Sequence, residues 1–304
     1  MIGAGVLWGT IGPAVEQLQR HSGLPTVDIS FWRGVIAGLA LAVLTVAMAR
    51  RTGAPARTRA RPPARAVMVG LLCGASTAAS QLCYFAALGE LGIAPATLVA
   101  LGLGPLLVAL GEAAFLGRRP TRVLLVVIAM SVAGMGLLVG GAGTTAPQDG
   151  DIALGVLLAA GSAATYAAVV LASGAASHAL GATGLNLVVF VGVVLSLAPV
   201  VAVSGLTVPQ DAEAIALTAY LGLVASALAY GLYFYAARTL RSTVISVLAL
   251  LEPLTASVLA WIAFGQALNG VGILGGGLLL AAIVVLSTAT PRRYEAGEPP
   301  PAIT

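Results

Sequence analysis

The sequence contains no lysine, and only 9% of its 304 residues are charged. A soluble domain carries roughly 25% charged residues, so this deficit indicates a surface that faces lipid more than water. Without a lysine amine, the chain has neither a P-loop lysine nor a Schiff base for pyridoxal phosphate or retinal. The composition therefore excludes these chemistries and argues against ATP-driven pumping by this chain alone.

Cysteine and histidine are also scarce. Cys73 and Cys83 share one apolar stretch, so we expect small buried side chains there rather than a disulfide or a metal site. His21 and His178 lie near predicted segment ends, where we expect solvated side chains. No metal and no cofactor is predicted. The isoelectric point of about 9.4 comes from loop arginines and gives no reason to expect a nucleic-acid partner.

Long apolar runs dominate what is present: 59% of the residues are hydrophobic, and the mean hydropathy is +1.01. A membrane helix needs about 20 mostly apolar residues. On this criterion the sequence predicts an all-α integral membrane protein with ten helices, at residues 2–19, 29–49, 66–88, 94–116, 121–140, 152–174, 184–204, 213–236, 243–264 and 269–289. The start, "MIGAGVLWGT", predicts a first membrane helix rather than a signal peptide.

The arginines predict the orientation of these segments. With ten spans, 13 of the 15 arginines fall on one side, whereas the opposite loops carry six acidic residues and Arg20. The positive-inside rule then places both termini in the cytoplasm of a multi-pass protein of the cell (inner) membrane. Membrane lipid is accordingly an expected partner.

The two halves of the chain resemble each other. "LGLGPLLVALGEAAFLGRR" (101–119) aligns with "ALLEPLTASVLAWIAFGQA" (249–267), so that Pro105 matches Pro253. This predicts one repeat at 1–140, a linker at 141–151, a second repeat at 152–289 and a disordered cytoplasmic tail at 290–304. Because each repeat holds five spans, the second enters the membrane inverted, and inverted repeats place a substrate site near the midplane.

A carboxylate and a proline lie side by side in the ninth segment. Pro253 removes one backbone hydrogen bond and pushes against the carbonyl of Ala249, so we expect a kink there and at Pro105. A carboxylate at this depth, Glu252, costs at least about 2.5–3.5 kcal/mol unless it faces a cavity or stays protonated. Both features indicate the interior of the bundle, although a purely structural kink with a neutral Glu252 is an alternative.

Taken together, the motifs resemble the EamA-type branch of the drug/metabolite transporter superfamily, whose members have ten helices. The resemblance covers nearly the whole chain and is carried by "LWGT" (7–10), "FWRG" (31–34), "LGLGPLLVAL" (101–110) and, most specifically, "LLEPLTASVLAWIAFGQ" (250–266). It implies a secondary transporter that exports small metabolites, amino acids or toxic compounds. The family's Gly-Glu pairs are absent, because the chain reads Gly117-Arg118 and Gly265-Gln266, whereas Glu112 lies inside the fourth segment.

Polar stripes at helical spacing predict the residues that line a substrate cavity. In the third segment, Gln81 and Tyr84 share a face with Thr77 and Ser80, and the eighth segment repeats the pattern. The candidates for a small amphipathic or aromatic solute are Trp8, Gln81, Tyr84, Ser162, Tyr166, Tyr230 and Tyr233. For the serines, helix–helix hydrogen bonding is an equally good interpretation.

Ionisable residues inside the spans are the candidates for ion coupling. Glu252 and Glu112 are expected to be deep, and Glu252 is preferred as a proton carrier for antiport. Arg33 could snorkel outward, pair with an embedded carboxylate or hold a substrate carboxylate. Glu16 is expected to be solvated. Uncoupled facilitation remains open, as does the oligomeric state, and a polytopic enzyme, a channel or a non-transporting scaffold is a more distant alternative.

Overall fold

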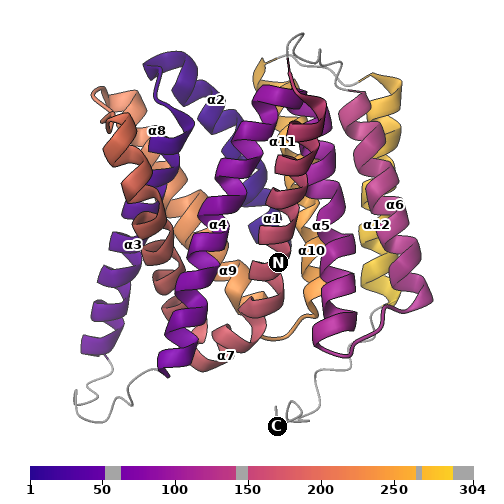
Figure 1. The fold of residues 1–304 in the computed structure, drawn as a ribbon, viewed down its shortest axis with the longest axis horizontal. Helices are drawn as coiled ribbons and strands as arrows, with labels where there is room; N and C mark the ends of the chain where they lie inside the picture. Colours follow the sequence, from indigo (N-terminus) through magenta and orange to yellow (C-terminus); the bar gives the residue numbers. More distant parts are fainter. Residues whose placement is uncertain (52–62, 142–149, 265–268, 290–304) are drawn as a thin grey trace.

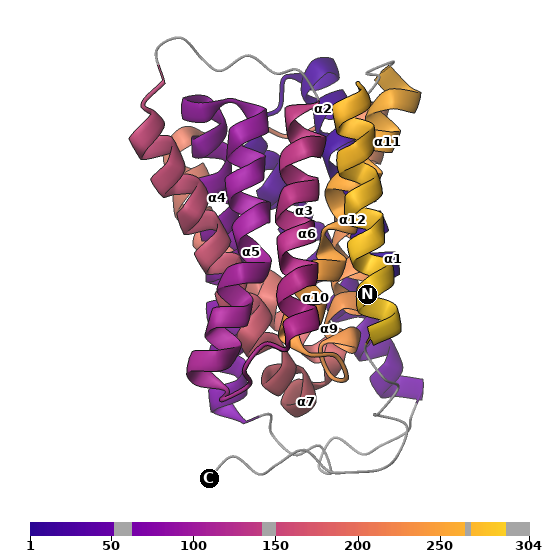
Figure 2. The ribbon, with the colours of Figure 1, turned by 90° about the vertical axis from the view of Figure 1, so that its right-hand side faces the viewer.

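The structure is a computed structural model, and it describes residues 1–51, 63–141, 150–264 and 269–289. Helices run roughly side by side along one direction (Figures 1 and 2), and the described residues include no strand. Helices satisfy every backbone polar group within one segment, which a lipid environment requires. The helices are α1 (Ile2–Gly9), α2 (Ile11–Ser22), α3 (Thr26–Arg51), α4 (Ala64–Leu91), α5 (Ile93–Phe115), α6 (Arg122–Gly140), α7 (Ile152–Ser204), α8 (Ala212–Gly222), the π-helix η2 (Leu223–Leu228), α9 (Ala229–Ala236), α10 (Ser242–Ala249), α11 (Leu251–Phe264) and α12 (Gly270–Ala289).

Seven of the described helical stretches are long and apolar enough to cross a membrane. One of them, α7, has 53 residues, which at 1.5 Å per residue is about 80 Å and far exceeds a hydrocarbon core of about 30 Å. Gly181 interrupts it with non-helical backbone (φ 72°, ψ 158°). The sixth and seventh predicted segments are therefore the two arms of α7.

Contacts with α4 show that the chain reverses direction at Gly181. Gly70, near the start of α4, faces Leu185 and Val188 of the second arm, whereas Leu91 at the end of α4 faces Gly155 of the first arm. α4 thus lies against both arms, and this arrangement places polar residues of α4 beside those of α7.

Two predicted segments are divided in the structure. The first consists of α1 and α2, which meet at Thr10, because Pro13 has no N–H to donate to the carbonyl of Gly9. The ninth consists of α10 and α11, separated by Leu250, and Pro253 lies in the first turn of α11. By contrast, α5 continues through Pro105 without ending.

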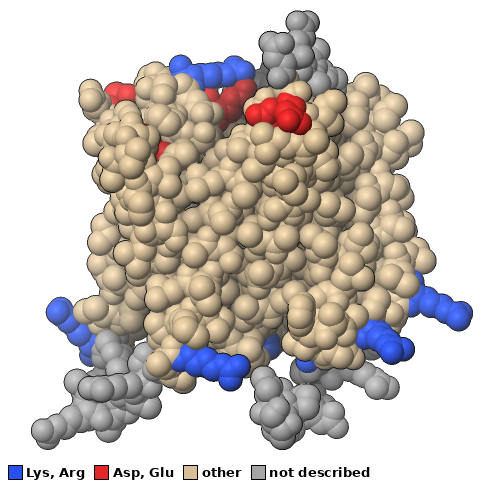
Figure 3. All heavy atoms as spheres, in the orientation of Figure 1, with Lys and Arg blue, Asp and Glu red and all other residues tan. Residues whose placement is uncertain are grey.

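Charged side chains gather at the two ends of the molecule, and the broad band between them is nearly free of charge (Figure 3). Most of the visible arginines lie at the lower end in this view, whereas the visible acidic side chains and a smaller basic group lie at the upper end. Large apolar side chains within the helices, such as Leu39, Val43 and Leu72, are exposed. Such a surface is stable only against lipid, so the chain is a multi-pass membrane protein. The predicted tail and most of the predicted linker lie outside the described residues.

Candidate functional site

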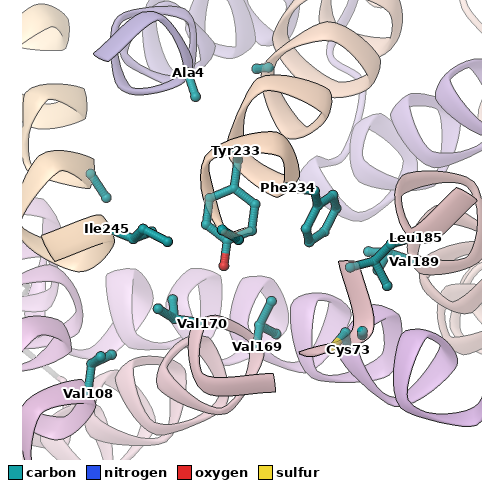
Figure 4. Packing of buried hydrophobic residues seen from close by; sticks show 14 of the residues in the cluster. Ala4, Cys73, Val108, Val169, Val170, Leu185, Val189, Tyr233, Phe234 and Ile245 are labelled. Atoms are coloured by element: carbon teal, nitrogen blue, oxygen red, sulfur yellow. The ribbon is translucent and has the colours of Figure 1, made fainter. Parts of the chain in front are cut away.

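Aromatic side chains form a cluster at the centre of the bundle. The ring of Trp8 on α1 lies 5.0 Å from that of Tyr230 and 5.5 Å from that of Tyr233, both on α9. Phe190 of α7 meets Tyr230 edge-on at 5.3 Å. Figure 4 shows Tyr233 and Phe234 surrounded by aliphatic side chains from several helices. The cluster therefore joins α1 of the first half to α7 and α9 of the second.

Two glycines allow α1 to approach α10 and α11 closely enough to position Trp8. A Cβ atom on Gly5 would lie 3.0 Å from the carbonyl oxygen of Leu248, and one on Gly9 would lie 2.4 Å from the Cβ of Thr255 and 2.7 Å from the carbonyl oxygen of Glu252. Larger residues would push the helices apart. The spacing of four residues between the glycines puts both contacts on one face of α1.

Glu252 lies at the start of α11, directly after the break at Leu250, and its side chain is half-buried. It interacts electrostatically with Arg33, and also with Tyr84, Tyr166 and Tyr230. Candidates from α3, α4, α7 and α9 thus interact with one carboxylate on α11. The break between α10 and α11 therefore interrupts the apolar packing at the position of Glu252.

Arg33 is only 8% exposed and does not snorkel outward. Its Nε donates a hydrogen bond to Oγ of Ser226, at 3.2 Å, in the π-helix. Within the described residues, neither Arg33 nor Glu252 forms an ion pair at bonding distance. A buried guanidinium without a direct anionic partner is costly unless an anion or water reaches it.

Several predicted cavity residues have buried polar atoms without a hydrogen-bond partner. These atoms are Nε1 of Trp8, Oε1 of Gln81 and the hydroxyl oxygen of Tyr166. Buried polar groups are normally paired, and each unpaired group costs about 1–3 kcal/mol. Three such atoms on α1, α4 and α7 are the pattern expected where water or a ligand completes the bonding.

Other predicted cavity residues already bond to the protein. Ser162 of α7 lies 3.0 Å from the hydroxyl of Ser80 on α4, which is the helix–helix interpretation. The hydroxyl of Tyr233 lies 2.9 Å from Oγ of Ser173, and the side chain is 1% exposed. Tyr84 bonds to Thr97 at 2.7 Å. Tyr233 and Ser162 therefore brace the helices around the site.

The structure places Glu112 away from Glu252. Its carboxylate is 1% exposed and accepts hydrogen bonds from N–H of Ser242 (3.0 Å), Oγ1 of Thr243 (2.6 Å) and the guanidinium of Arg241 (3.2 Å). These donors form the N-terminus of α10, where the helix dipole favours a negative charge. Depth along α5 suggested a cavity carboxylate, but Glu112 caps another helix beside the arginines.

The acidic end of the molecule holds a second set of contacts, around His21, whose side chain is exposed as expected. Nε2 of His21 on α2 lies 3.0 Å from Oδ1 of Asp211, and Nδ1 lies 3.6 Å from Oε2 of Glu213. The N–H of Ala214 and then His21 hold the pKa of Asp211 below its usual value. His21 therefore joins α2 to the start of α8. His178, at the other end of the molecule, bonds to the carbonyl of Arg238.

Two further buried polar residues lie beside the charged and aromatic candidates. Ser226 is fully buried and receives the Arg33 bond, and Asn186 of α7 is fully buried beside the same π-helix. Ser226 belongs to the polar stripe predicted for the eighth segment, where it lies four and seven residues before Tyr230 and Tyr233. Nothing in the apolar sequence around Asn186 predicted a site residue. Among the described residues, no group of three metal-ligating side chains occurs.

Comparisons with known proteins identify the family and the fold. The model of the EamA-like transporter family matches residues 1–140 and 153–288. The uncharacterized transporter YwfM of Bacillus subtilis (strain 168) is 29% identical over 295 residues, which are 97% of this chain and 94% of that protein. A solved crystal structure with 21% identity covers 96% of this chain and 97% of its own at a TM-score of 0.77, so the fold is shared. The chain is therefore a membrane transporter that belongs to the EamA-like transporter family.

Proposed function

We propose that the protein is a secondary transporter that exports small amphipathic solutes bearing a carboxylate, by alternating access around the Arg33–Glu252 interior. The observation that carries the proposal is the pairing of a buried guanidinium with a nearby carboxylate that does not reach it. A solute that offers charge of both signs, such as an amino acid, would complement both side chains.

The surrounding side chains suit such a solute. A guanidinium can hold a carboxylate with two parallel hydrogen bonds. Trp8 and Tyr230 offer aromatic faces at 5.0 Å from each other, and an apolar or aromatic group can pack there. Nε1 of Trp8 and Oε1 of Gln81 supply an unused donor and an unused acceptor. These groups come from both halves of the chain, so their relative motion would open and close the site.

Proton coupling follows if Glu252 exchanges its proton with both sides of the membrane. The half-buried side chain keeps contact with accessible space, and no hydrogen bond from the described residues fixes it. A protonated Glu252 would leave Arg33 free for the anionic group of a solute, whereas an ionised Glu252 would compete for Arg33. A proton moving into the cell and a solute moving out would then bind to the site in turn.

Glu252→Gln tests the coupling. We expect the variant in proteoliposomes to lose accumulation driven by a proton gradient while it retains exchange of solute down its own gradient. The solute is first identified by a growth screen of an overexpressing strain against amino acids and toxic compounds. Glu16→Gln is the matched control, because Glu16 is exposed in an ion pair with Arg20 and should leave accumulation unchanged.

Uncoupled facilitation is the second candidate, and one observation favours it. A solute carboxylate can bind the buried guanidinium of Arg33 without any change of protonation at Glu252. If Glu252→Gln changes neither accumulation ratios nor their response to pH, facilitation replaces antiport as the mechanism.

A further inference from the structure

The π-helix η2 sets the rotational phase between α8 and α9. The inward residues follow a step of four: Thr218, Gly222, Ser226, Tyr230 and Phe234. In a regular α-helix each step of four residues drifts by about 40°, because one turn takes 3.6 residues. Four such steps amount to about 160°, which would carry Phe234 to nearly the opposite face from Thr218. The π-helix at 223–228 has one more residue in its turn than an α-helix, which offsets much of this drift and keeps these five residues facing inward.

A wide turn weakens the regular backbone pattern, and one side chain from another helix supports it here. Nδ2 of Asn186 on α7 donates a hydrogen bond to the carbonyl oxygen of Ala227, at 2.8 Å, inside η2. Asn186 is 0% exposed, and its Oδ1 has no partner. An apolar bilayer offers no other donor to the carbonyl oxygen of Ala227. Without the Asn186 amide, this oxygen would therefore bond only to a backbone N–H, as in a regular α-helix.

Residues in and next to η2 contact both the charged Arg33 and the aromatic Trp8. Ser226, next to Ala227, accepts the hydrogen bond from Arg33. Tyr230, three residues beyond Ala227, packs against Trp8 with ring centroids 5.0 Å apart and ring planes tilted by 60°. Gly222, just before the turn, lets Ile36 of α3 come so close that an added Cβ would lie 2.6 Å from it. A rotation at η2 would therefore move Ser226 and Tyr230 away from their partners.

We propose that Asn186 is a positioning residue that holds η2 in its wide form, and that η2 in turn aims Ser226 at Arg33 and Tyr230 at Trp8. Conversion of η2 to a regular α-helix would rotate α9 against α8 by about 100°, the angle of one residue. The Asn186–Ala227 bond thus favours the orientation of α9 in which Tyr230 faces Trp8 over the orientation in which it does not. The inference goes beyond the proposed function and does not depend on the identity of the solute.

Trp8 provides a spectroscopic reading of this orientation. The sequence contains three tryptophans, so Trp32→Phe and Trp261→Phe leave Trp8 as the single emitter. In this background we expect Asn186→Leu to move Trp8 emission to longer wavelength and to increase its quenching by acrylamide, because Tyr230 leaves the indole. Ser177→Ala is the matched control. It removes a similar buried bond from α7 to α9, from Oγ of Ser177 to the carbonyl of Phe234 (2.7 Å), but outside η2, and should leave emission unchanged.

Deletion of Leu223 tests whether Asn186 acts through η2. Leu223 is 46% exposed, and its removal takes one residue out of the wide turn. The deletion should reproduce the shift in emission, and Asn186→Leu should add nothing to it, since coupled residues are not additive. Circular dichroism confirms that each variant is folded, and Asn186→Ala replaces Asn186→Leu if the latter does not fold. Unchanged emission in a folded Asn186 variant would overturn the inference. So would a shift on Asn186→Leu that is equally large in the chain with Leu223 and in the deletion variant. Emission is read without solute, so a failed transport assay leaves this result standing.

Discussion

At the scale of single residues, the ionisable side chains of the bundle find different environments. Glu112 receives hydrogen bonds from three residues at a helix start, so its charge is compensated within the protein. Arg33 has one hydrogen bond and an electrostatic partner that does not touch it. Burial of a charge is tolerated when it is paired, and an incompletely paired charge is the mark of a functional position. This difference separates Glu112, which caps a helix, from Arg33 and Glu252.

Replacement of Glu112 should affect stability through the start of α10. We expect Glu112→Ala to lower the free energy of unfolding by about 3 kcal/mol, because the variant leaves buried donors and Arg241 without their acceptor. Glu112→Gln retains one acceptor oxygen and should cost less. Thermal unfolding in detergent measures both. Glu16→Ala, at an exposed pair, should cost at most about 0.5 kcal/mol, and a Glu112→Ala effect as small as this would contradict the capping role.

At the scale of elements, close helix packing depends on glycines at a few contacts. α6 and α12 lie side by side in both ribbon views (Figures 1 and 2). A Cβ atom on Gly275 of α12 would lie 2.2 Å from the backbone nitrogen of Leu138 on α6, and one on Gly134 would lie 3.0 Å from the carbonyl oxygen of Gly275. Backbone atoms cannot rotate away as a side chain can. The two helices must therefore separate if Gly275 gains a side chain.

Gly275→Ala should consequently destabilise the protein by about 2 kcal/mol, a typical cost of overpacking. Gly277→Ala on the same helix is the control, since nothing lies within 4 Å of its added Cβ. There the gain in helix propensity should leave the melting temperature unchanged or slightly higher. Equal melting temperatures for the two variants in detergent would mean that α6 and α12 are less closely packed than described.

At the scale of the whole molecule, the directions in which the helices run agree with the distribution of charge between the two ends. The chain runs toward the acidic end in α4 and α6, and back toward the arginine end in α3 and α5 (Figure 1). The second half begins in the opposite sense, because the first arm of α7 runs from the end of α4 toward its start. This alternation is what an inverted repeat requires, and most of the arginines visible in Figure 3 lie at one end.

Cysteine labelling of intact cells tests this orientation. Cys73→Ala and Cys83→Ala first remove the native thiols. We expect a membrane-impermeant maleimide to label Gln210→Cys, between α7 and α8, in intact cells. Arg119→Cys, after α5, should react only when the membrane is permeabilised, because the positive-inside rule places the arginine end in the cytoplasm. The reverse pattern would show the opposite orientation and would reverse the direction assigned to transport.

The sequence determined those properties that depend on composition and on position along the chain. Apolar runs predicted the helices, because lipid leaves the backbone no other way to satisfy its hydrogen bonds. The motif around Glu252 predicted the family. The charges of the loops predicted an orientation that labelling would test.

Only the tertiary structure decided which polar residues meet. Glu112 and Glu252 look alike in sequence, since both are carboxylates inside apolar segments, yet the former caps α10 and the latter faces Arg33. Likewise, the wide turn at η2 and its bond to Asn186 join residues 41 positions apart. Hydrophobic periodicity specifies the face of a helix, but the partner of a polar atom depends on how neighbouring helices pack, which spacing along one segment does not encode.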